Sequence, residues 1–90
     1  MPMNTSIFNT KQFNVFKEAC QEYMSQIAVK RLSNGSYCIM IPDDDTTIRC
    51  HEKIVDYFQT KGGFNAHYEV TPLGLICEEI IDKFSDDMNI

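Results

Sequence analysis

The dipeptide Asn34-Gly35 lies between two segments rich in strand-forming residues, and it restricts the fold more than any other local feature of this chain. Both residues readily adopt the positive φ angles of a type I′ turn, whose twist matches that of the flanking strands. The sequence therefore predicts a β-hairpin of residues 27–32 and 37–41. Because residues 37–41 are apolar on both faces, we expect them to form a central strand. The predicted register pairs Leu32 with Tyr37 and Lys30 with Ile39.

A helix is expected directly before the hairpin, because several terminal signals agree. Asn9 is a suitable N-cap, Gln12 lies at the third helical position of a capping box, and Phe8 and Phe13 occupy the hydrophobic-staple positions. Apolar residues then recur at spacings of three and four, which is typical of one buried helix face. This stripe consists of Phe13, Phe16, Cys20, Tyr23 and Ile27.

A second helix is expected after Pro42, which ends the hairpin because proline cannot donate to a strand ladder. It should run to about Lys61, where Gly62-Gly63 supplies a left-handed stop. Its expected inner face contains Ile48, Ile54, Val55 and Phe58.

Residues 64–70 alternate apolar and polar side chains, which predicts a strand with one face in water. Thr71 and Pro72 then provide the N-cap and first position of a last helix. The expected buried stripe of this helix consists of Leu73, Ile76, Cys77, Ile80 and Phe84.

The predicted class is α+β, in the order α-β-β-α-β-α, with the hairpin and one further strand forming a small three-stranded sheet packed by helices. Ninety residues support one domain, so we assign residues 1–90 to a single compact unit. Residues 1–8 and 86–90 are expected to be loose ends.

The charge of the chain limits the classes of partner. A net charge of −5 argues against a nucleic-acid binder, because neutralising phosphates needs clustered lysine and arginine. Residues 1–42 carry a net charge of +2, whereas residues 43–90 carry −7. The second half would therefore favour a basic partner.

The sequence also suggests a compartment. The sequence lacks the basic start and following apolar segment of a signal peptide, and no apolar run has the length of a membrane span. We therefore expect a cytoplasmic protein. The four cysteines lie among apolar residues, where a thiol behaves as a small buried hydrophobe, and we expect all of them to be reduced. They are Cys20, Cys38, Cys50 and Cys77.

Three groups of polar residues suggest chemistry, but none is interpreted as a reacting site. Residues 43–45 are three aspartates that could hold a hard cation, yet carboxylates before a helix also cap its N–H groups and complement its dipole, which is the interpretation we favour. Cys50 and His51 are adjacent, but neighbouring residues on a helix point in different directions and do not form a nucleophile–base pair. Cys50, His51, His67 and Cys77 lack the paired spacing of a zinc site. We therefore expect no catalytic residue, metal or cofactor.

Two surfaces are candidate partner-binding sites. The wet face of the strand at 64–70 carries Asn65, His67 and Glu69, and an edge strand there could pair with another chain. The last helix presents Leu75, Glu78, Glu79 and Asp82 opposite its buried stripe, an acidic face that a basic partner could use.

The segment Tyr68-Glu69-Val70-Thr71-Pro72-Leu73-Gly74 resembles the junction where winged-helix transcription regulators leave the wing and enter the next helix. Residues 55–59 and 64–70 would then be the wing strands, and the resemblance covers about twenty residues. It implies a DNA-binding regulator, although the upstream helix-turn-helix with basic groups that this class needs is replaced by a hairpin and three aspartates.

The leading hypothesis is a small accessory, inhibitor or adaptor protein that acts by surface complementarity and is not an enzyme. The absence of a catalytic motif and the acidic second half motivate it. Homodimerisation is a further expectation, because a three-stranded sheet leaves open edges. The alternatives are the winged-helix-like regulator and a small metal- or thiol-dependent enzyme.

Overall fold

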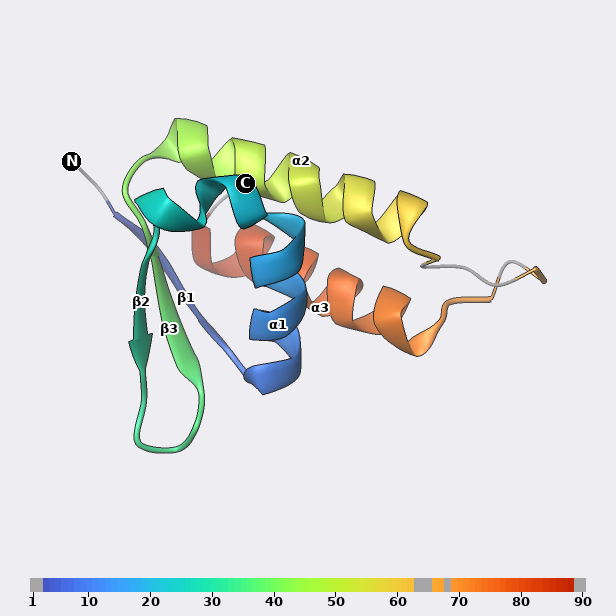
Figure 1. The fold of residues 1–90 in the computed structure, drawn as a ribbon, viewed down its shortest axis with the longest axis horizontal. Coiled ribbons are helices and arrows are strands. Elements are labelled where there is room, and N and C mark those ends of the chain that lie inside the picture. The colour runs from blue at the N-terminus through green and yellow to red at the C-terminus, as the bar shows by residue number, and fades with distance from the viewer. Residues whose placement is uncertain (1–2, 63–65, 68, 89–90) are drawn as a thin grey trace.

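The computed structural model describes residues 3–62, 66–67 and 69–88, which form a three-stranded antiparallel sheet and a layer of helices (Figure 1). The predicted α+β class, with a small sheet packed by helices, is confirmed. In chain order the elements are β1 (Asn4–Phe8), α1 (Thr10–Ala19), the 3₁₀ helix η1 (Gln21–Gln26), β2 (Ala28–Arg31), β3 (Tyr37–Ile41), α2 (Asp44–Thr60) and α3 (Pro72–Met88).

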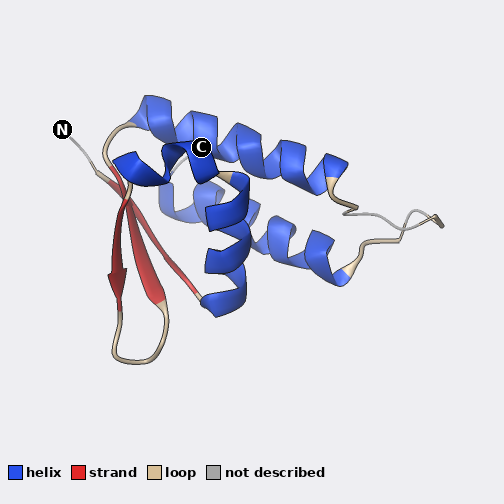
Figure 2. Ribbon diagram, in the orientation of Figure 1, coloured by secondary structure: helices blue, strands red, loops and turns tan. Residues whose placement is uncertain are grey.

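The strands lie in the order β1-β3-β2, so the prediction that residues 37–41 form the central strand is confirmed. The helices pack on one face of this sheet (Figure 2). Ile39 and Ile41 point to that face and are fully buried, whereas Cys38 and Met40 point to the other face and are half-buried. One face of the sheet is therefore open, and it includes exposed Ile7 of β1.

The predicted hairpin exists, but its predicted register is wrong by one residue. Leu32 N–H donates to Ser36 O at 2.8 Å, so the loop contains three residues, 33–35, and not two. Gly35 has φ +85°, the left-handed conformation that ends such a loop. The extra loop residue shifts every pair along the strands. Arg31 pairs with Tyr37, Lys30 with Cys38, Val29 with Ile39 and Ala28 with Met40.

The third strand is β1, and the expectation that residues 1–8 form a loose lead-in is wrong for residues 4–8. β1 pairs antiparallel with β3, with Ser6 opposite Ile39 and Phe8 opposite Tyr37. Phe8 is fully buried, and its ring centroid lies 5.2 Å from that of Phe16.

The strand predicted at residues 64–70 falls partly outside the described residues, since residues 63–65 and 68 are not described. Its described residues lie in none of the three strands of the sheet. The third strand of the described sheet therefore comes from the N-terminal segment and not from residues 64–70.

The capping box that begins α1 is confirmed. Asn9 Oδ1 accepts from Gln12 N–H at 2.8 Å, and Gln12 Oε1 accepts from Asn9 N–H at 3.0 Å. The apolar stripe continues beyond the end of α1 at Ala19, because η1 carries the chain on to Ile27.

α2 and α3 begin and end close to their predicted positions, with one error in each. In α2, Ile48 was expected to face the core but is 45% exposed, because the helix turns Thr47, Cys50 and Ile54 inward. Gly62 follows α2 with φ +85°, as the predicted stop requires. α3 continues to Met88, which is buried, so residues 86–88 are not loose. Residues 89–90 are not described.

Candidate functional site

The acidic face predicted on the last helix is present on α3. Thr71 Oγ1 accepts from Gly74 N–H at 3.0 Å, which confirms the predicted N-cap, and Pro72 is the first helical residue. Cys77, Ile80 and Phe84 are fully buried against the rest of the core. This stripe orients the opposite side of α3 toward solvent.

Four predicted site residues lie together on that outer side. Positions 75, 78, 79 and 82 follow the spacing of one helix face. Leu75 is 52% exposed, and the three carboxylates beside it are exposed. We refer to Leu75, Glu78, Glu79 and Asp82 as the acidic α3 face.

The carboxylates of the acidic α3 face are not neutralised by basic side chains of the described chain. The recorded ion pairs join Arg49 to Asp45 and Lys53 to Glu22, and none involves α3. Glu79 Oε1 accepts a hydrogen bond from Gln12 Nε2 at 3.2 Å, so this carboxylate also links α3 to α1. The carboxylates of Glu78 and Asp82 are therefore the more available charges.

The second predicted surface lies partly outside the described residues. Asn65 lies outside the described residues, and His67 and Glu69 are exposed residues outside the three strands. This partner-binding surface therefore stays a prediction.

The open edge of the sheet is β2, which sequence reasoning did not single out. All four of its residues are exposed, and β3 is its only neighbour in the described sheet. The signal was present, because Lys30 and Arg31 in a short strand are typical of the edge of a sheet.

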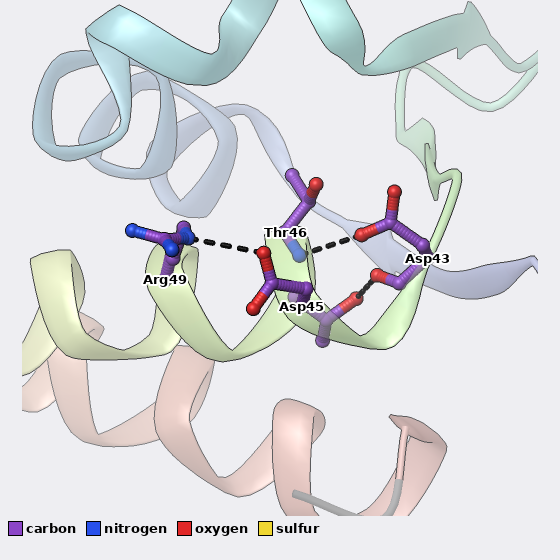
Figure 3. Close-up of polar contacts among 5 residues, drawn as sticks. Asp43, Asp45, Thr46 and Arg49 are labelled. Atoms are coloured by element: carbon purple, nitrogen blue, oxygen red, sulfur yellow. Dashed lines mark hydrogen bonds and ion pairs between the residues drawn. The ribbon is translucent and has the colours of Figure 1, made fainter.

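The aspartates at 43–45 cap and extend α2, as predicted (Figure 3). Asp43 Oδ1 accepts from Thr46 N–H at 2.7 Å, and Thr47 Oγ1 donates to Asp43 O at 2.8 Å. Asp45 pairs with Arg49 at 3.2 Å, one turn along the helix. Each carboxylate therefore has a structural partner, since Asp44 accepts from Asn4.

Replacing Asp43 with asparagine is expected to keep the cap but flatten the acid dependence of stability. Hydrogen bonding to Thr46 lowers the pKa of Asp43, so its ionised form stabilises the fold above the unfolded pKa of about 3.9. That contribution is lost as pH falls through the lower folded pKa. Between about pH 4 and pH 2 the melting temperature of Asp43→Asn should fall less than that of the wild type. Asp86→Asn is the control, and parallel profiles for Asp43→Asn and wild type would contradict the assignment.

The thiol and imidazole groups do not converge on one site. Cys50 is fully buried and contacts Cys20, whose Sγ lies 3.5 Å from Cys50 O. His51 instead packs edge-on against Phe84, with ring centroids 5.8 Å apart. Among the described residues, no three histidine, cysteine or acidic side chains are grouped closely enough to hold a metal ion.

Burial and mutual hydrogen bonding determine the protonation of these thiols. A hydrogen bond between the side chains of Cys20 and Cys50, together with burial, raises the pKa of Cys20. The same bond lowers the pKa of Cys50, while burial acts in the opposite direction. Burial alone raises the pKa of Cys77. Cys50 is fully enclosed by the core.

An open groove of about 380 Å³ lies between β1 and the end of α3. Ser6 Oγ donates to Asp87 Oδ2 at 2.6 Å, which ties the two elements together beneath it. Every buried polar side chain described in the groove has a hydrogen-bond partner, so none of them is aimed at a ligand. It is lined by Thr5, Ser6, Ile7, Cys38, Lys83 and Asp87.

The wing proposed from the resemblance to winged-helix regulators is corrected by the structure. Residues 55–59, which would form its first strand, lie within α2. Comparison with protein-family models, curated proteins and solved structures found no match for this chain. No helix among the described residues combines the length and apolar character needed to cross a membrane.

Proposed function

We propose that this protein is a protein-interaction module whose acidic α3 face binds a basic partner. The observation that supports the proposal is the exposure of Leu75 beside carboxylates that no basic side chain of the described chain neutralises. An exposed leucine supplies apolar contact area, and the surrounding charges select the sign of the partner. The net charge of −5 would steer such a partner from a distance.

The rigidity of the face also supports this role. α3 is held by fully buried residues on its inner side and by the bond from Gln12 to Glu79 at its flank. The carboxylates are therefore presented on a fixed scaffold, which reduces the ordering cost of binding. The proposal places the protein in the cytoplasm, where its four cysteines, none of which is in a disulfide, would stay reduced.

The test is quantitative affinity capture from native lysate with the wild type and two charge-reversed variants. Glu78→Lys/Asp82→Lys alters the acidic α3 face. Glu52→Lys/Asp56→Lys makes the same change at the same spacing on exposed positions of α2. Both variants should fold, since all four side chains are exposed.

We expect a partner that the wild type and the α2 variant capture equally and that the α3 variant captures at least about tenfold less. A tenfold loss of affinity corresponds to about 1.4 kcal/mol. Recovery of the same proteins in equal amounts by all three forms would show that α3 is not the interface. Reduction by both variants alike would assign the effect to net charge and contradict a defined site.

A further inference from the structure

The outer edge of β2 has the geometry of a strand-addition site. The opposite edge of the sheet, β1, is packed against α3, with Ser6 bonded to Asp87. β2 has no such cover in the described chain, because all four residues Ala28–Arg31 are exposed. In the strand order β1-β3-β2, the outer side of β2 faces away from both other strands (Figure 1).

The hydrogen-bond pattern identifies which backbone groups point outward. In an antiparallel pair, residues alternate between bonding to the neighbouring strand and facing away from it. Leu32 N–H donates to Ser36 O, so Lys30, two residues earlier, also bonds toward β3. Val29 and Arg31 therefore direct their N–H and C=O groups to the open side. These are the groups that an incoming strand would use.

The side chains of β2 specify the charge of the incoming strand. Lys30 and Arg31 point to opposite faces of the sheet, and neither takes part in the ion pairs recorded for the described chain. Val29 precedes both charged residues along β2 and is 39% exposed. A strand with carboxylates opposite Lys30 and Arg31 and an apolar residue opposite Val29 complements this edge.

A second copy of the chain does not fit this edge. Pairing two β2 strands antiparallel would bring Lys30 and Arg31 of each copy together, four cations without an anion. Like charges on facing strands are destabilising, and lysine on an edge strand discourages self-pairing. Nucleic acid is also a poor occupant, because two cations on a protein of net charge −5 neutralise few phosphates.

We propose that the outer edge of β2 binds an extended acidic peptide segment, which adds to the sheet as a fourth strand. This goes beyond the proposed binding of a basic partner by α3, since it assigns a second surface of opposite charge. Antiparallel addition places residues opposite Arg31, Lys30 and Val29 in that order along the peptide. The matching probe is a blocked, fluorescein-labelled peptide Thr-Val-Glu-Glu-Val-Thr.

The test measures binding of this probe by fluorescence anisotropy at low salt. Lys30→Glu/Arg31→Glu should weaken binding at least about tenfold. Lys11→Glu/Lys61→Glu, an equal charge change on exposed residues elsewhere, should weaken it much less. A probe with lysine in place of glutamate should bind the wild type at least about tenfold more weakly. Unchanged binding to Lys30→Glu/Arg31→Glu, or equal binding of the lysine probe, would overturn the proposal.

A backbone variant separates strand addition from simple charge attraction. Val29→Pro removes an N–H that faces outward and leaves the bonds to β3 in place, which is where proline is tolerated in an edge strand. Val29→Pro should weaken binding of the acidic probe, whereas Val29→Thr, which retains the N–H, should not weaken it. Equal binding by these two variants would overturn the proposal, as would tighter binding of a labelled single-stranded oligonucleotide than of the acidic probe. If Val29→Pro fails to fold, the charge variants still decide.

Discussion

Removal of residues 1–8 is expected to abolish the cooperative unfolding transition of this protein. The deletion leaves β2 and β3 as a two-stranded hairpin, which is marginally stable in water. It also removes Phe8, which is fully buried against Phe16, and truncating a buried phenylalanine alone costs about 3–5 kcal/mol. The whole domain is expected to have a free energy of unfolding of roughly 5–13 kcal/mol. The measurement is urea unfolding followed by circular dichroism.

Two neighbouring residues provide the control for this truncation. Phe8 is fully buried, whereas Ile7, on the same strand, is 50% exposed on the open face. Phe8→Ala should lower the urea midpoint strongly, and Ile7→Ala should change the free energy of unfolding by about 0.5 kcal/mol or less. If the truncated chain unfolds cooperatively at the wild-type urea midpoint, residues 1–8 do not stabilise the fold, and the loose N-terminal segment expected from the sequence is correct.

The reason that sequence reasoning missed β1 is visible in its inner face. Asn4 and Ser6 point toward the helices, where an apolar side chain is expected, and Ile7 points to solvent. The polar side chains are accommodated because helix residues bond to them: Asn4 donates to Thr47 at 2.7 Å, and Ser6 donates to Asp87. These partners are more than forty residues away. No local pattern contains that information.

Features whose causes are local were predicted correctly. The capping box at Asn9 and the caps at Asp43 and Thr71 depend on residues three positions apart, so the sequence displays both partners. The hairpin was predicted from Asn34-Gly35, but its register failed because a three-residue loop uses the same dipeptide as a two-residue turn.

The same distinction applies to the candidate surfaces. The acidic α3 face follows from helical periodicity, and all four of its predicted residues lie together. The β2 edge depends on strand order, which is set by where β1 docks, and β1 was not expected. The hydrogen bond from Gln12 to Glu79 could not be predicted either, since it requires α1 and α3 to be adjacent.

Phe84→Ala is expected to cause the largest loss of stability among single substitutions in α3. Phe84 is fully buried, and its ring lies 6.2 Å from that of Phe16 in α1 and 5.8 Å from that of His51 in α2. Because the side chain joins three helices, its removal leaves a cavity that no single helix can fill by a small shift. The expected cost is about 3–5 kcal/mol, or a fall in melting temperature of at least about 12 °C for a domain of this size.

Leu75→Ala is the matched control, because it truncates an apolar residue of the same helix that is 52% exposed. Its effect on the free energy of unfolding should be within about 0.5 kcal/mol. Equal urea midpoints for Phe84→Ala and wild type would contradict the assigned packing. The two variants also distinguish the two sides of α3. If Leu75→Ala loses partner binding at unchanged stability, the loss is caused by the change to the outer face. Loss with Phe84→Ala would instead follow from the failure of the core to hold that face in place.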